Sequence, residues 1–383
     1  MFGNNLFLQA AVYSGAAALF ILVSGWWLYL SPMKKSGGEA APPSPRLAGW
    51  LAGLLSVASL MWVVGALWDA SMHIKTGEIP AGADFLWPPH LVLYGGFLLA
   101  FLVAVLVVGV IAAKGWQTGV HDPRRWVRQN PYLGAVALAS LYEMMAIPGD
   151  ALWHEIFGRD LTAWSPPHVM IGLMIALVIT SAIGVLIQSF PGKRRAGWRD
   201  AAIVLLLGLM LNTVYIIGVL EWELPVHSTI VDSRPIWYYP LVGGSLAFFA
   251  LALAKRLVRW RWSATATASV FYLVRLPVTL GLHLTGNITP ALPLVFILGA
   301  IFMDLVPLQQ ISSPALRWLV TAAAFTAGFA LLALPALTLR ASIPVLNTGD
   351  LTYAIAGTLL ATLLLLPVAW SSARRLLGKR AQV

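Results

Sequence analysis

The sequence predicts an all-α, polytopic membrane protein, a helical bundle with about eleven transmembrane helices. Of its 383 residues, 59% are hydrophobic and only 10% are charged, which is too apolar for a domain with a water-exposed surface. The apolar residues gather in runs of about 20, each long enough to cross roughly 30 Å of hydrocarbon as an α-helix. Basic residues gather in alternate connections between the runs, which is typical of a membrane protein.

The first apolar run, 8–30, is too long for a signal-peptide core, and no positive residue precedes it and no small-residue cleavage site follows it. We therefore expect a retained helix there. The other expected helices span 47–70, 89–113, 132–152, 166–190, 199–222, 237–256, 264–286, 290–311, 315–338 and 350–372. No second soluble domain is indicated, so we expect a single transmembrane domain over 1–383.

The loop charges predict an orientation. Lysines and arginines cluster near 34–46, 114–128, 193–199, 255–261 and 374–380, which fall on one side of an alternating topology. Because basic loops stay in the cytoplasm, we expect a multi-pass protein of the inner (plasma) membrane with its N-terminus outside and its C-terminus inside. The net charge of +10 is then a topology signal and gives no support to nucleic-acid binding. Most of the remaining His, Asp and Glu fall in the outer loops.

The stretch DALWHEIFGRDLTAWSPPH, residues 150–168, carries the clearest functional motif. Asp150 and His154 are four residues apart and share one helical face, and a Pro-Pro pair starts the next helix directly before His168. Two imidazoles and one carboxylate suit copper, zinc or non-haem iron, and the absence of cysteine excludes thiolate ligands. We therefore predict a metal site with Asp150, His154 and His168 as ligands and catalytic residues.

The same pattern occurs earlier, in WDASMHIKTGEIPAGADFLWPPH, residues 68–90. Asp69 and His73 precede Asp150 and His154 by the same 81 positions, and His90 in WPPH corresponds to the histidine of SPPH. We therefore predict that Asp69, His73 and His90 form a second metal site of the same kind.

Two weaker copies follow. EWELPVH keeps an acid and a histidine as Glu223 and His227, with tyrosines near the place of the PPH histidine, and TLGLH keeps His283 with threonine in the acid position. Equivalent residues at periodic positions indicate duplication. The predicted helix-pair repeats span about 47–113, 132–190, 199–256 and 264–311.

Other polar residues fall at membrane depth. Glu143 lies seven residues before Asp150, on nearly the same helical face, where it would act as a hydrogen-bond partner of a ligand, a proton relay or a further ligand. A protonated carboxyl bonded to a neighbouring helix explains it equally well. We also expect Arg275 and Asp304 to form a buried ion pair.

A purely structural explanation competes with the metal sites. Histidine is favoured at a helix C-terminus, an aspartate and a histidine four residues apart can simply hydrogen-bond, and Pro-Pro is an ordinary helix start. Two copies with three matching side chains each favour the functional interpretation, because ionisable residues at a membrane boundary are usually functional.

The segment FGRDLTAWSPPH, following D-x-x-x-H, resembles the metal-binding segment found in one membrane-embedded chain of the copper-containing membrane monooxygenases, the particulate methane and ammonia monooxygenases. In that family, an Asp is followed after three residues by a His and after about a dozen more by a second His. The family motif also contains an Arg-Asp pair, here Arg159 and Asp160, and a helix that starts with Pro-x-His. The resemblance implies that Asp150, His154 and His168 bind copper in an oxidoreductase acting on a small or lipid-soluble substrate. The chain departs from the family in its eleven expected helices, rather than about six, and in one extra residue between the histidines.

The sequence leaves three other functions open. A copper or zinc transport or handling protein would need a polar path across the bilayer, and inward from Asp150 only Glu143 continues one. A zinc-dependent membrane hydrolase would lack the H-E-x-x-H motif. Haem ligation would not require the adjacent acids. The substrate, the redox partner and the oligomeric state are also left open.

Overall fold

The chain is an all-α, polytopic membrane bundle. The computed structural model describes residues 15, 19, 22–31, 42–77, 85–157, 163–190, 197–224, 235, 237–290, 296–306, 310–338 and 348–377. Within these ranges it contains helices and no strand, and eight of the helices are long and apolar enough to cross a membrane. This confirms the predicted fold class.

The chain folds into two compact units. The first contains Met1–Met61, Pro80–Asp160 and Trp164–Arg194, and the second contains Trp62–Ile79, Leu161–Ala163 and Arg195–Val383. Helix α2 (Pro45–Thr76) therefore begins in the first unit and ends in the second. That all the helices form a single domain stays a prediction.

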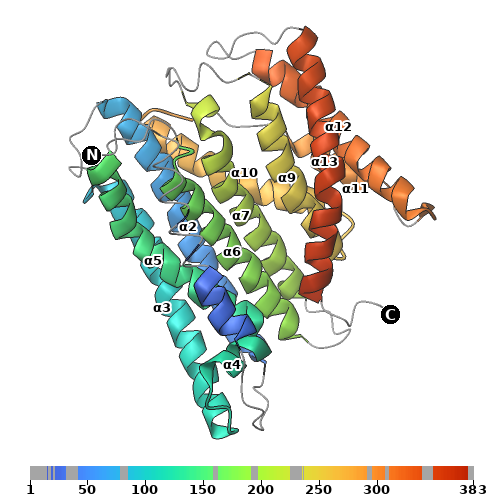
Figure 1. The fold of residues 1–383 in the computed structure, drawn as a ribbon. Coiled ribbons are helices and arrows are strands. Elements are labelled where there is room, and N and C mark those ends of the chain that lie inside the picture. The colour runs from blue at the N-terminus through green and yellow to red at the C-terminus, as the bar shows by residue number, and fades with distance from the viewer. Residues whose placement is uncertain are drawn as a thin grey trace. The chain divides into compact units, whose positions relative to one another are not determined.

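The first unit is built around helix α5 (Pro131–Phe157), which packs against α3 (Pro88–Gln117) and α6 (Pro166–Gln188) (Figure 1). The side chains between these helices are small or aliphatic and fully buried, such as Val136 of α5 and Val178 of α6. Gly184 on α6 lies against the ring of Tyr132, where an added Cβ would come within 2.5 Å of the ring. Small residues of this kind allow helices to approach closely in a bilayer, where hydrophobic burial alone does not drive association.

A short helix and a π-helical segment close one end of this unit. Asp122 caps α4 (Pro123–Gln129) by accepting from the backbone N–H of Arg124 at 2.8 Å. The Arg124 side chain also bonds the same carboxylate, which holds the pKa of Asp122 below its usual value. Arg128 then donates to the Leu28 carbonyl at 2.8 Å, and so anchors η1 (Trp26–Leu30) to α4.

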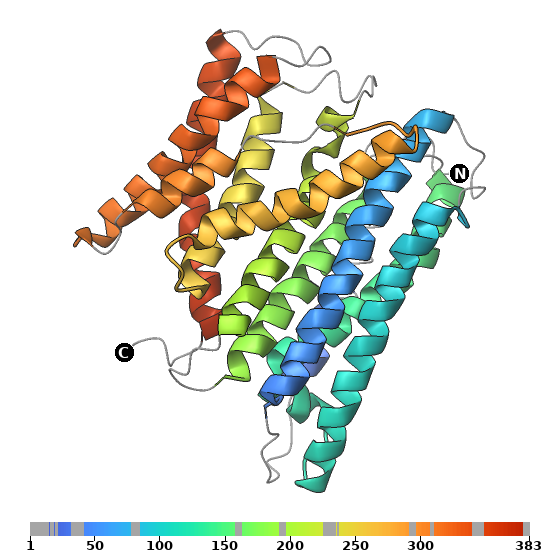
Figure 2. The same cartoon turned by 180° about the vertical axis from the view of Figure 1, so that it is seen from behind.

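The second unit joins the end of α2 to the remaining helices. These are α7 (Gly197–Glu223), α9 (Tyr238–Leu257), α10 (Ser263–Leu284), α11 (Ile297–Leu305), α12 (Pro314–Thr338) and α13 (Thr348–Leu377). Helix α9 packs against both α7 and α13, and α11 packs against α12. Figure 2 shows α10 crossing α7 and α9 obliquely. Val63 and Leu67 of α2 enter one core cluster with Ile216 and Leu220 of α7 and Leu282 of α10.

Large apolar side chains are exposed along the helices, as a lipid-facing surface requires. Leu102 and Leu106 of α3, Leu273 of α10, and Leu360 and Leu364 of α13 are all more than half exposed. Such a density of exposed leucine would be a liability in water but is expected where lipid tails are the solvent. The protein is therefore in contact with the bilayer along both units.

Two expected helices differ from what the structure describes. The run 8–30 lies mostly outside the described residues, although 22–30 is helical. Among the described residues of the run 290–311, the helix is the nine-residue α11, and residues 290, 306 and 311 are not helical. Nine residues rise only about 14 Å, too short to cross the bilayer. Pro290 is described and lies outside the helix, as expected of a residue that lacks a backbone N–H.

The predicted ion pair between Arg275 and Asp304 is wrong. Asp304 instead accepts from Lys255 Nζ at 2.9 Å and from the backbone N–H of Thr265 at 2.7 Å, so its carboxylate caps the start of α10. Arg275 pairs with Glu223. The error arose because the sequence places charges at a depth in the membrane but does not give the rotation of each helix about its axis.

Candidate metal centre

The first candidate site lies where α5 ends and α6 begins, within the first unit. Asp150 and His154 occupy the last two turns of α5 and project from one face. On the other side, Pro166 and Pro167 take the first two positions of α6, which have no need of a backbone N–H, and His168 follows as the third. Contact between α5 and α6 brings the two helix ends together.

The Asp150 carboxylate lies between two imidazoles. Its Oδ2 is 3.8 Å from His154 Nε2, and its Oδ1 is 3.9 Å from His168 Nε2. The side chains of Asp150, His154 and His168 are 26%, 28% and 36% exposed, so the site is partly shielded from solvent. Asp150 Oδ1 itself is buried and has no hydrogen-bond partner among the described residues.

These spacings suit a shared cation better than direct hydrogen bonds. A charge-assisted N–H···O bond would bring nitrogen and oxygen to about 2.7–2.9 Å. In contrast, ligands around one tetrahedral ion with bonds of about 2.0–2.1 Å lie roughly 3.3 Å apart. One ligand atom from each of the three residues lies within 4.8 Å of the others. Three such atoms are at most about 2.8 Å from a common centre, so a closing movement of less than about 1 Å per ligand would complete the bonds.

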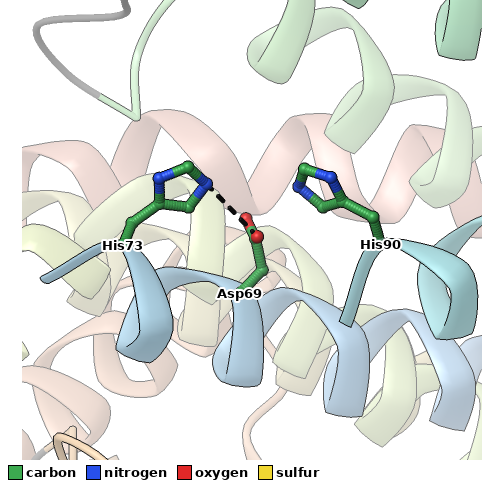
Figure 3. A group of neighbouring side chains, drawn as sticks. All are labelled: Asp69, His73 and His90. Atoms are coloured by element: carbon green, nitrogen blue, oxygen red, sulfur yellow. Dashed lines mark ion pairs between the residues drawn. The ribbon is translucent and has the colours of Figure 1, made fainter. Parts of the chain in front are cut away.

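The second candidate site uses Asp69 and His73 of α2 and His90 of α3. Figure 3 shows the Asp69 carboxylate between the two imidazoles, with a dashed line to His73. Asp69 Oδ1 is 3.3 Å from His73 Nε2, and one ligand atom from each of the three residues lies within 4.8 Å of the others. The described part of the chain thus contains two Asp-His-His triads that could hold a metal ion.

Both triads are built by the same local structure. Asp69 lies seven residues before the end of α2 at Thr76, and Asp150 lies seven residues before the end of α5 at Phe157. In both helices the first histidine lies three residues before that end. His90 is the third residue of α3, after Pro88 and Pro89, just as the second histidine of the other triad is the third residue of α6. The duplication inferred from sequence therefore extends to the helix boundaries.

In the third copy, the acidic residue belongs to an internal ion pair. Glu223, the last residue of α7, pairs with Arg275 of α10, and both side chains are fully buried. Tyr239, near the start of α9, donates to Glu223 Oε1 at 3.3 Å. As in the triads, the acidic residue contacts the start of the next helix, here α9. The positive charge beside Glu223 is the guanidinium of Arg275. The rings of Tyr215 and Phe271 lie 5.7 and 5.5 Å from the guanidinium carbon.

The remaining candidate residues fall outside the triads. His227 lies outside the described residues. His283 is exposed near the end of α10 and belongs to neither triad. Glu143 is fully buried on α5, and both of its carboxyl oxygens lack a hydrogen-bond partner among the described residues. Sequence reasoning missed the Glu223–Arg275 pair. The one signal that could have indicated it was the acidic residue at the end of an apolar run.

Comparison of the chain with protein-family models, with curated proteins and with solved structures finds no match in any of the three. The chemistry of the site therefore rests on its own geometry. That geometry contains a carboxylate and two imidazoles per triad, partial exposure, and no lysine or arginine paired with Asp150 among the described residues. Such a site can bind a transition-metal dication and leaves coordination positions open.

Proposed function

We propose that the protein is an integral membrane metalloprotein, a copper-dependent oxidoreductase similar to the membrane monooxygenases, with Asp150, His154 and His168 as its metal ligands. The observation that carries the proposal is the Asp150 carboxylate, with a buried and unpartnered Oδ1, set between two imidazole nitrogens at 3.8 and 3.9 Å. The Asp150 side chain is only 26% exposed, so its carboxylate is partly shielded from water and favours a cation beside it.

The donor set supports copper as the metal. Imidazole ligands suit copper and zinc, and among divalent first-row metals Cu²⁺ binds a given nitrogen and oxygen site most tightly. The motif around these residues also resembles the copper-binding segment of the membrane monooxygenases, and it keeps the aspartate, both histidines and the helix-starting proline. Zinc and iron are the alternatives that metal analysis separates from copper.

The surroundings of the triad support a small or lipid-soluble substrate. Leu152 and Ile156 lie at the same level of α5 as the ligands but on its opposite face, and they are 54% and 55% exposed. An apolar molecule dissolved in the bilayer can reach such a surface without crossing water. Three protein ligands leave positions where copper, when bound, would supply redox chemistry with dioxygen and such a substrate. The loop charges support an outward-facing site in the plasma membrane.

The test is copper loading followed by an oxygen-consumption assay. Protein reconstituted in lipid nanodiscs and loaded with copper should consume dioxygen when given a quinol reductant and a short alkane or alcohol. The His154→Ala, His168→Ala double variant should lose this activity. His283→Ala, which removes an exposed histidine outside both triads, should keep it.

Other outcomes overturn the proposal in specific ways. Zinc bound in place of copper, together with ester or peptide hydrolysis, would assign a hydrolase. Movement of copper or zinc into proteoliposomes without oxygen consumption would assign metal transport.

A further inference from the structure

Helix α5 carries a buried carboxyl group that the metal triad does not use. Glu143 has no exposed surface, and neither of its carboxyl oxygens has a hydrogen-bond partner among the described residues. Ser140, one turn earlier, is also fully buried, and its hydroxyl is likewise without a partner there. Buried polar groups are normally paired, so two unpaired ones on the same helix need an explanation.

These groups continue the face of α5 that carries the metal ligands. Along α5 the spacing is three residues from Ser140 to Glu143, seven from Glu143 to Asp150, and four from Asp150 to His154. Such spacings keep side chains on one side of a helix. Seven residues correspond to about 10 Å along the axis, so Glu143 lies about two turns deeper than Asp150. Pro148 lies between them within the helix and has no N–H to donate to the preceding turn.

Among the described residues, no charged side chain pairs with Glu143. Helices α3, α4 and α6 pack against α5 in the first unit. The described titratable residues of these three helices are His90, Tyr94 and Lys114 on α3, Arg124, Arg125 and Arg128 on α4, and His168 on α6. None of them forms an ion pair or a hydrogen bond with Glu143. An isolated carboxyl in an apolar interior is stable as the neutral acid and becomes an anion only when a positive charge comes near.

We propose that Glu143 is the proton-exchanging residue of the metal site: it holds a proton while the triad is empty and releases it when a cation binds to Asp150, His154 and His168. The inference rests on the proposed metal site. Charge balances, because a dication on the Asp150 carboxylate leaves a net charge of about +1, which the Glu143 anion offsets when its proton departs. The proton leaves towards the triad, about 10 Å away, whose side chains are partly exposed.

The expected coupling is measurable. A net charge of +1 at about 10 Å, with an effective dielectric constant of about 20, changes the proton affinity of a carboxyl roughly tenfold. Linkage is reciprocal, so the neutral acid weakens metal binding by the same factor. Glutamine at position 143 reproduces the neutral acid permanently.

The experiment is an infrared difference spectrum, recorded on the whole protein in lipid before and after addition of Cu²⁺ or Zn²⁺. The wild-type protein should lose the carbonyl band of a protonated carboxyl group when the metal binds. Glu143→Gln should show no such loss, should keep the metal stoichiometry, and should bind the metal more weakly, by a factor that approaches about tenfold as the pH rises. Asp350→Asn, which removes a carboxyl in the first turn of α13, is the matched control and should keep the band change.

The outcomes separate this inference from the proposed function. Metal bound by the triad with no change in the carboxyl band, or with the same affinity in Glu143→Gln, would overturn the role of Glu143 and leave the metal site standing. A wild-type protein that binds no metal would overturn both. The wild-type spectrum decides the first point without any variant, so a failure of Glu143→Gln to fold does not remove the test.

Discussion

Replacing Glu223 by alanine is expected to lower the free energy of unfolding by about 3–5 kcal/mol. Glu223 and Arg275 are both fully buried, and the substitution would leave the guanidinium without its counter-charge in an apolar interior. Tyr239 would lose its hydrogen-bond acceptor in the same step. Chemical unfolding in mixed micelles, followed by tryptophan fluorescence, measures the change.

A double variant distinguishes the lost counter-charge from the lost side-chain volume. In Glu223→Gln, Arg275→Met both charges are removed while most of the volume is kept, so most of the stability should return, because buried ion pairs are often replaceable by apolar groups at little cost. Equal destabilisation in the single and double variants would contradict the assignment of a buried ion pair.

Asp150→Ala is expected to weaken metal binding at the first triad by about 100-fold or more. The carboxylate is the one anionic ligand of the triad, and loss of even an outer hydrogen-bond partner of a metal ligand commonly costs 10–100-fold. Isothermal titration with Cu²⁺ or Zn²⁺ measures the affinity.

The duplication provides the matched control for this variant. Asp69→Ala removes the equivalent aspartate of the other triad, at the same distance from its helix end. It should leave the high-affinity binding by Asp150, His154 and His168 in place and remove only a second equivalent of metal. Identical binding curves for Asp150→Ala and the wild-type protein would contradict the assignment of Asp150 as a ligand.

Most of the fold could be predicted because the signals are local. Long apolar runs define spans in a bilayer regardless of what packs against them, and proline marks helix starts such as Pro88 and Pro166. At 290–311, the apolar composition predicted a helix longer than α11, which the described residues place at Ile297–Leu305. The rotation of each helix about its axis depends on packing partners far away in sequence, and for this reason Arg275 was paired with the wrong acid.

The triads could be predicted because their geometry is encoded in spacing. An acid and a histidine four residues apart share a face in any helix, and Pro-Pro-His places the last ligand at a fixed position in the next helix. The sequence could also place Glu143 on the face of Asp150. It could not show that Glu143 has no hydrogen-bond partner among the residues that the structure describes, since that depends on the helices packed against α5. Nor could it show that Glu223 pairs with Arg275 of α10.

The most direct test of the metal site is X-ray absorption spectroscopy on the copper-loaded protein. The protein should carry at least one copper per chain, bound by nitrogen and oxygen, with the outer-shell scattering of two imidazoles. In the His154→Ala, His168→Ala, His73→Ala, His90→Ala variant, from which all four triad histidines are removed, both the copper and the imidazole scattering should disappear, while His283→Ala should match the wild-type protein. Retention of copper with an unchanged imidazole signal in the quadruple variant would contradict the assignment of the triads as metal sites.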